Sequence, residues 1–161
     1  MARQPSKAFR RPDAMTMGTD LPLGFFEHLV VEGPDAVIYA DAAGVIRYWN
    51  VAATRIFGFA ESETIGEPLD LIIPGRLRAR HWEGYNKVMD GAPSHYGSGA
   101  LLAVPARHKE GRQISVEFTM LPLHSDTGVL LGIAAFLRDA TTRFEEFRTL
   151  RRELAALKQE S

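Results

Sequence analysis

The most regular pattern in the chain is an alternation of apolar and polar residues over positions 113–122. A period of two places every second side chain on the same face of a β-strand. The apolar positions of this segment are Ile114, Val116, Phe118 and Met120. We therefore predict a strand near the centre of a sheet, with these four side chains facing the core.

Four further segments predict strands. Residues 35–40 and 45–49 are apolar runs separated by a turn at Gly44, so they are expected to pair as a hairpin. Residues 100–106 and 130–137 lie on either side of the alternating segment and are separated from it by turns. The chain thus predicts an α+β fold built on a five-stranded antiparallel sheet.

The remaining segments predict helices. Residues 21–30 indicate a short amphipathic helix, and residues 51–57 a second helix with Asn50 as its N-cap and Gly58 as its stop. Residues 76–90 predict a longer helix. A single helix cannot cover a five-stranded sheet, so we expect the short helices and the longer one to lie together on one face. Small-molecule sites commonly lie in the space between two such layers.

His81 lies in the middle of the apolar face of the helix at residues 76–90. At 3.6 residues per turn it shares this face with Leu77, Gly84, Tyr85 and Val88. A buried imidazole needs a hydrogen-bond partner or a metal. Two interpretations stay open at this point. His81 is either a core histidine bonded to a carbonyl or a tyrosine, or an axial ligand to haem iron.

The chain divides into three parts. Residues 1–20 show no periodicity and predict a mobile N-terminal arm. Residues 21–139 form the globular domain with its N-terminal helix. Residues 140–161 predict one polar helix whose apolar positions are spaced alternately three and four apart, as in a coiled-coil seam: Phe147, Leu150, Leu154 and Leu157.

Composition narrows the function. The 161 residues carry a net charge of −1 and no apolar run of membrane-spanning length, so we expect neither a nucleic-acid nor a membrane partner. The absence of cysteine excludes disulfides, zinc thiolate sites and thiol nucleophiles. Candidate acids and bases are scattered and form no catalytic motif, so we expect no enzyme. A cytoplasmic location is the default expectation.

Several segments, taken in order, resemble the conserved motifs of PAS domains. They are residues 35–38, 44–53, 57–59, 65–69, 109–112 and 138–141. This resemblance implies a sheet with strand order 2-1-5-4-3, short helices on one face and flanking N- and C-terminal helices. It also implies a sensory and dimerisation module that binds haem, flavin, a small metabolite or no ligand, and that signals through its C-terminal helix.

Within that family, residues 74–85 are most similar to the helix of the haem-binding oxygen sensors of the FixL type. The resemblance implies His81 as the proximal ligand of haem b, with Lys87 and His95 near the propionates. The porphyrin would pack against Leu101, Val116, Phe118 and Ile133. The sequence departs from those sensors at two points, since the spacing from His81 to Tyr85 is one residue longer and Leu101 replaces the distal arginine.

These observations leave two function hypotheses. The first is a haem-based sensor of a diatomic gas (O2, CO or NO) or of redox state; its apolar distal side would suit CO, NO or weak O2 binding. The second is a PAS module that dimerises or binds a small metabolite, with a structural His81. The flavin photosensors of the family need a cysteine that this chain lacks. In either case we expect a homodimer formed through the N- or C-terminal helix, with an unknown downstream effector.

Overall fold

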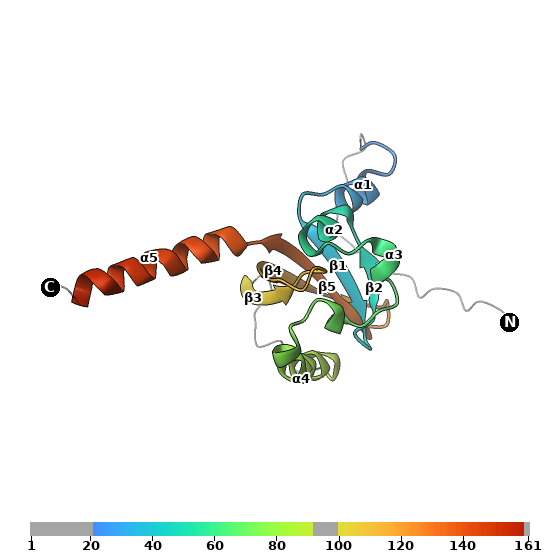
Figure 1. Cartoon of the computed structure of the whole chain (residues 1–161). Coiled ribbons are helices and arrows are strands. Elements are labelled where there is room, and N and C mark those ends of the chain that lie inside the picture. Colours follow the sequence, from blue (N-terminus) through green and yellow to red (C-terminus); the bar gives the residue numbers. More distant parts are fainter. Residues whose placement is uncertain (1–20, 92–99, 160–161) are drawn as a thin grey trace.

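The computed structural model describes residues 21–91 and 100–159 (Figure 1). The predicted arm at residues 1–20 and the candidate residue His95 lie outside these ranges. Five antiparallel strands form one sheet in the order β2-β1-β5-β4-β3, as predicted. The strands are β1 (Ala36–Asp41), β2 (Ile46–Trp49), β3 (Leu102–Arg107), β4 (Gln113–His124) and β5 (Leu130–Asp139).

The helices lie mainly between β2 and β3 in the chain. They are α1 (Phe25–Val31), α2 (Val51–Phe57), α3 (Glu61–Thr64), the 3-10 turns η1 (Leu69–Leu71) and η2 (Gly75–Leu77), α4 (Arg78–Met89) and α5 (Thr141–Gln159). Helix α5 extends away from the sheet (Figure 1). Within the described ranges, no helix combines the length and the apolar character that a membrane crossing requires. The α+β prediction is confirmed.

Asn50 connects the N-terminal elements, in addition to its predicted role as the N-cap of α2. Its Oδ1 accepts hydrogen bonds from the backbone N–H groups of Ala53 (3.0 Å) and Val37 (2.9 Å). Its Nδ2 donates to the carbonyls of Val30 (2.9 Å) and Asp35 (3.0 Å). One buried side chain thus joins α1, β1 and α2, and Gly58 ends α2 in the left-handed conformation with φ of 80°.

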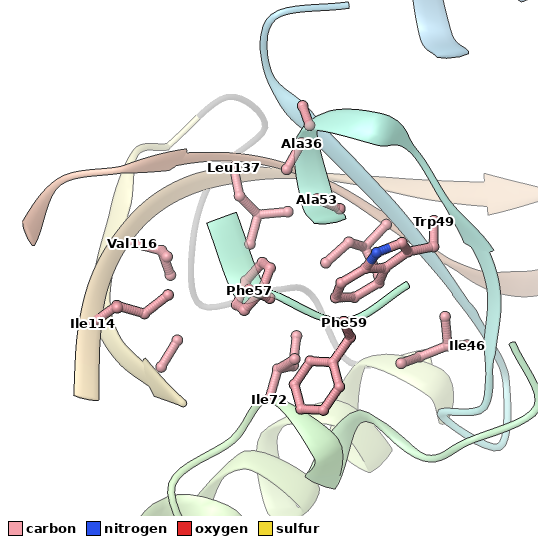
Figure 2. Close-up of a cluster of buried hydrophobic side chains, with 13 residues drawn as sticks. Ala36, Ile46, Trp49, Ala53, Phe57, Phe59, Ile72, Ile114, Val116 and Leu137 are labelled. Carbon is pink, nitrogen blue, oxygen red and sulfur yellow. The ribbon is translucent and has the colours of Figure 1, made fainter. Parts of the chain in front are cut away.

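The predicted register of β4 is confirmed. Ile114 and Val116 are 1% and 2% exposed, and Phe118 packs against the same buried cluster. This cluster, called here the main core, lies between the sheet, α2 and residues of the segment that follows α2, such as Phe59 and Ile72 (Figure 2). Its buried members are Ala36, Ile38, Ile46, Trp49, Ala52, Ala53, Phe57, Phe59, Ile72, Ala106, Ile114, Val116 and Leu137.

A second, smaller cluster joins α4 to the sheet. Its buried members are Ala40 of β1, Tyr85 of α4 and Ile133 of β5. The other members are only half-buried: Leu69, Trp82, Val88, Met89 and Met120. This group is called the α4 cluster below. It holds α4 at one end of the sheet, whereas the main core lies against α2.

The start of α5 is fixed to the sheet by side-chain hydrogen bonds. Asp139 Oδ1 accepts from the backbone N–H of Thr141 (2.8 Å) and from its hydroxyl (2.6 Å). The Thr141 hydroxyl oxygen in turn accepts from the N–H of Ser115 on β4 (3.0 Å). An ion pair between Glu117 on β4 and Arg143 on α5 adds a further link. The direction in which α5 leaves the domain is therefore set by β4 and β5.

Candidate functional site

His81 lies on the side of α4 that carries two other aromatic residues. Its ring meets Trp82 edge-on, with 5.1 Å between centroids, and lies tilted against Tyr85 at 5.7 Å. The predicted face of α4 is largely confirmed, because Tyr85 is buried and His81 and Val88 are half-buried, although Gly84 is exposed. The imidazole is thus enclosed by aromatic rings on its own helix.

The Nδ1 atom of His81 is buried and has no hydrogen-bond partner within the described residues. Burial lowers the pKa of His81, and the negative charge of Asp70 opposes this shift in part. Burial therefore favours the neutral form of the imidazole. A buried ring nitrogen without a partner is costly in an otherwise satisfied protein. Such an atom can take a further partner, because a ring nitrogen of a neutral imidazole either donates a hydrogen bond or accepts one, and the unprotonated nitrogen can coordinate a metal.

The two aromatic neighbours of His81 are anchored by their polar atoms. The Tyr85 hydroxyl lies 2.6 Å from the Asp41 carbonyl oxygen, to which it donates, and 3.3 Å from that of Ala40. Burial raises the pKa of Tyr85, so it stays a donor. The Trp82 Nε1–H donates to Asp70 Oδ1 at 2.8 Å. Helix α4 is therefore attached on both sides of His81, to the end of β1 and to η1.

The structure brings together only some of the residues predicted to surround a haem. Ile133 belongs to the α4 cluster, as does Tyr85 next to His81. Val116 and Phe118 instead belong to the main core, which is filled by other side chains such as Phe57. Leu101 precedes β3 and is 64% exposed, so within the described residues it lines no buried wall.

Lys87 also lies away from this site. Its Nζ forms an ion pair with Glu83 at 2.6 Å, and both side chains are largely exposed on the opposite side of α4. Residues four positions apart lie on the same side of an α-helix, so Glu83 and Lys87 meet each other on the solvated face. A propionate contact from Lys87 would require this ion pair to open. The role predicted for His95 falls outside the described residues.

Two features of the site could contact a haem group: the imidazole of His81 and the apolar side chains of the α4 cluster. His81 supplies a neutral imidazole with a buried, unpaired nitrogen. The half-buried apolar side chains of Val88, Met89 and Met120, together with Ile133, supply the kind of wall that a porphyrin packs against. Within the described residues, no group of three or more metal-ligating side chains gathers to hold a bare ion. His81 and this partial wall are therefore the described residues that could hold a haem group, while Val116, Phe118 and Leu101 lie elsewhere.

Asp70 was not identified from the sequence, and Trp82 was noted only as a residue flanking the apolar face. Asp70 lies twelve residues before Trp82, and no local pattern connects an acid in a 3-10 turn to an indole on the next helix. A buried Trp needs an acceptor for its N–H, which is the one sequence signal that could have prompted a search for such an acid.

Comparison with known proteins identifies the family. Residues 32–145 match the family model described as the PAS fold, and this match covers most of the chain. The chain therefore belongs to the PAS family, as its motifs implied. PAS domains commonly dimerise and form parts of signalling proteins, and as a class they are sensory modules rather than catalysts.

Two curated relatives and one solved structure illustrate the relationship. An uncharacterised protein of Azorhizobium caulinodans is 35% identical over 119 residues, which are 73% of this chain and 16% of that protein. The sensor protein FixL of Bradyrhizobium diazoefficiens is 29% identical over 114 residues, which are 67% of this chain and 21% of FixL. The chain therefore spans less than a quarter of the length of these relatives.

The solved structure is a PAS domain from Colwellia psychrerythraea. It superimposes with a TM-score of 0.63 at 17% sequence identity, covering 74% of this chain and 98% of that domain. At this identity the similarity establishes the fold alone. The similarity to FixL agrees with the resemblance noted in the helix that carries His81.

Proposed function

We propose that this chain is the sensory domain of a signalling protein, and that it binds haem b through His81. In this proposal it detects a diatomic gas (O2, CO or NO) or a redox change. The single observation that carries the proposal is the buried, unpaired Nδ1 of His81, whose ring packs against Trp82 and Tyr85 of the α4 cluster. The similarity to the sensor protein FixL supports it. A cytoplasmic location and a non-catalytic role are parts of the same proposal.

The residues of α4 would hold the group and keep water away from it. Haem b, when bound, supplies an iron atom that takes a diatomic gas and can change oxidation state. His81 would bind it as a neutral imidazole, which its lowered pKa favours because no proton has to be displaced at neutral pH. Ile133 would form part of the apolar wall. The propionate contacts of Lys87 and His95 and the packing of Leu101, Val116 and Phe118 remain predictions.

The signal would leave through α5 in a homodimer. The apolar side chains of α5 are 40–62% exposed: Phe144, Phe147, Leu150, Leu154 and Leu157. Their spacing suits a coiled-coil seam with a second copy of the chain. Helix α1 has no buried residue and exposes Phe26 and Leu29, so it is the second candidate interface. The proposed units are thus an arm at 1–20, the sensory domain at 21–139 and the signalling helix at 140–161.

The dimer is tested by sedimentation velocity on the double variant Leu150→Asp plus Leu154→Asp. Two buried carboxylates would disrupt an apolar seam, so we expect the sedimentation coefficient to fall to that of a monomer. The matched control is Arg151→Asp plus Arg152→Asp, which changes two exposed charges on the same helix. If the sedimentation coefficient of the leucine variant is unchanged, α5 is not part of the dimer interface.

A second candidate function is a PAS module without haem, which dimerises or binds a small metabolite. The observation that favours it is the filling of the main core by Trp49, Phe57 and Phe59, with Val116 buried among them (Figure 2). The haem wall predicted from Val116 and Phe118 is therefore not open in this structure. In this case His81 would serve packing alone, through its ring contacts with Trp82 and Tyr85.

Absorption spectroscopy separates the two candidates. We expect purified protein titrated with haemin to develop a Soret band with one-to-one stoichiometry. His81→Ala should abolish or strongly shift this band, because it removes the axial ligand. His124→Ala is the matched control, since His124 is exposed at the end of β4. If the wild-type protein is folded but takes up no haem, the haem function is wrong and the second candidate function is supported.

A further inference from the structure

Trp82 connects α4 to two segments that are distant in the sequence. Its Nε1–H donates to Asp70 Oδ1 of η1 at 2.8 Å. Its six-membered ring lies against Gly44 in the turn between β1 and β2. A Cβ atom added at Gly44 would overlap this ring, and the φ of 74° at Gly44 also disfavours other residues. The close approach of indole and backbone is therefore possible only with glycine at position 44.

Asp70 is itself held in place before it meets Trp82. Arg78, the first residue of α4, donates from Nη2 to the backbone carbonyl of Asp70 at 2.9 Å. Its Nε donates to the carbonyl of Ile73 at 3.3 Å and lies 3.8 Å from Asp70 Oδ1. The guanidinium thus spans the loop from η1 to α4 and partly compensates the Asp70 charge. The acceptor of the Trp82 hydrogen bond has a fixed position on the sheet side of α4.

The orientation of His81 depends on these contacts because His81 and Trp82 are adjacent on one helix. A rotation of α4 about its axis would move both side chains together, since successive residues are separated by about 100°. Tyr85 resists the same rotation one turn later through its hydrogen bond to the Asp41 carbonyl. His81, in contrast, has no polar partner for Nδ1 within the described residues. Its direction is therefore set by its neighbours.

We propose that Asp70 and Trp82 are positioning residues for His81. Their hydrogen bond, with the indole ring placed on Gly44, fixes the rotation of α4 and with it the side from which His81 meets a ligand. The identity of that ligand as haem rests on the proposed function above, whereas the positioning itself does not. Partners that orient a metal-ligating histidine indirectly often change affinity by about 10- to 100-fold when removed.

The test measures the chemical access of His81 without any haem. Diethyl pyrocarbonate modifies neutral imidazoles, and peptide mass spectrometry separates the rate at His81 from the rate at exposed His124. We expect Asp70→Ala and Trp82→Phe to raise the His81 rate by about 10-fold, because loss of one hydrogen bond lets α4 turn or open. The rate at His124 should stay constant. Trp82→Phe removes both the N–H donor and the outer ring atoms that contact Gly44, whereas Asp70→Ala removes the hydrogen bond alone.

Two variants serve as controls. Asp70→Asn retains an acceptor oxygen at the same place and should restore the wild-type His81 rate, which a purely electrostatic role would not. Glu83→Gln breaks the exposed ion pair on the opposite side of α4 and should also leave the rate unchanged. Haemin titration of the same proteins should show about 10-fold weaker binding in Asp70→Ala and Trp82→Phe.

The outcomes separate this proposal from the proposed function. Equal His81 rates in wild type, Asp70→Ala and Trp82→Phe would overturn the positioning role. An equal increase at His81 and His124 would also overturn it, because it reports general unfolding. If the wild-type protein takes up no haem, the haem function fails while the modification rates still decide the role of Asp70 and Trp82.

Discussion

The main core and the α4 cluster are built in different ways. The main core is closed, since Ile46, Ala53 and Phe57 are fully buried and its contacts are apolar. The α4 cluster has three buried members, and most of its side chains are half-buried. Its helix is held largely by the polar atoms of Trp82 and Tyr85. One region thus depends on burial and the other on a few directed hydrogen bonds.

This difference indicates how the domain can respond to a ligand without unfolding. Regions with few buried apolar contacts open at lower free energy than the core of the same protein. A change at α4 would therefore leave the sheet and α2 intact. The unpaired nitrogen of His81 lies in the less stable region, where a new contact can shift the helix. The closed main core gives the domain its fold, and α4 is the element that we propose responds to a ligand.

The largest expected effect is the loss of Phe57. Phe57→Ala should lower the free energy of unfolding by about 3–5 kcal/mol, because it leaves a large cavity in a closed core. Val88→Ala in the α4 cluster should cost less than about 1.5 kcal/mol, because its side chain is only half-buried. Urea denaturation of both variants measures the difference. Equal losses would contradict the distinction between the two regions.

The second effect concerns the hydrogen bond that anchors α4. Tyr85→Phe should lower the free energy of unfolding by about 1–2 kcal/mol, since the Asp41 carbonyl loses a buried donor while the ring stays in place. Tyr39→Phe is the matched control, because its hydroxyl donates to the Leu131 carbonyl at a longer 3.2 Å in a more exposed place. Thermal and urea unfolding should show a smaller loss for Tyr39→Phe. The reverse order would contradict a role for Tyr85 as the anchor.

The third prediction has the opposite sign. His81→Leu should stabilise the ligand-free protein by about 1 kcal/mol at pH 7, because it replaces a buried, unpaired nitrogen with apolar atoms of similar size. Burial lowers the pKa of His81, so the unfolded chain binds a proton at a higher pH than the folded one. Wild-type stability should therefore fall as the pH drops below about 6.5, and His81→Leu should lack this part of the loss. A destabilised variant would mean that His81 has a partner in solution.

The smallest effect is expected at the ion pair between Asp35, just before β1, and Arg138, near the end of β5. Arg138 donates to Asp35 through Nε (2.7 Å) and Nη2 (2.8 Å). This hydrogen bonding lowers the pKa of Asp35, so the contribution is present above the ordinary pKa of the carboxyl and is lost as the pH falls through the lowered value. Arg138→Gln should differ from wild type at pH 6, and the difference should begin to shrink below about pH 4 and vanish only below the lowered pKa of Asp35. Solvent weakens exposed pairs, so a large or pH-independent effect would contradict this account.

The sheet could be predicted because its patterns are local. The alternation over residues 113–122 specified which face of β4 is buried, and Asn50 and Gly58 bounded α2 correctly. The strand order followed from the resemblance to PAS domains, and the structure confirmed it. The strand period and the helix caps need only neighbouring residues, because both are set by local backbone geometry, whereas the strand order needed the resemblance.

The candidate site was predicted less completely. Helical periodicity correctly predicted that His81 and Tyr85 face the interior. It could not predict which other segments pack against that face of α4. Val116 and Ile133 were expected to form one wall, yet they belong to different clusters at the two ends of the sheet. Lys87 was expected near a ligand and instead pairs with Glu83 in solvent.

The sequence by itself therefore determined the PAS fold through its motifs, the buried face of β4 and most of the inward face of α4 with His81. Only the tertiary structure decided that Trp82 rests on Gly44, that Asp70 receives its N–H and that the His81 nitrogen has no partner among the described residues. The physical reason is the distance along the chain over which each kind of interaction acts. Periodicity and caps act over a few residues of backbone, whereas the partner of a buried polar atom is chosen by packing between segments far apart in the chain.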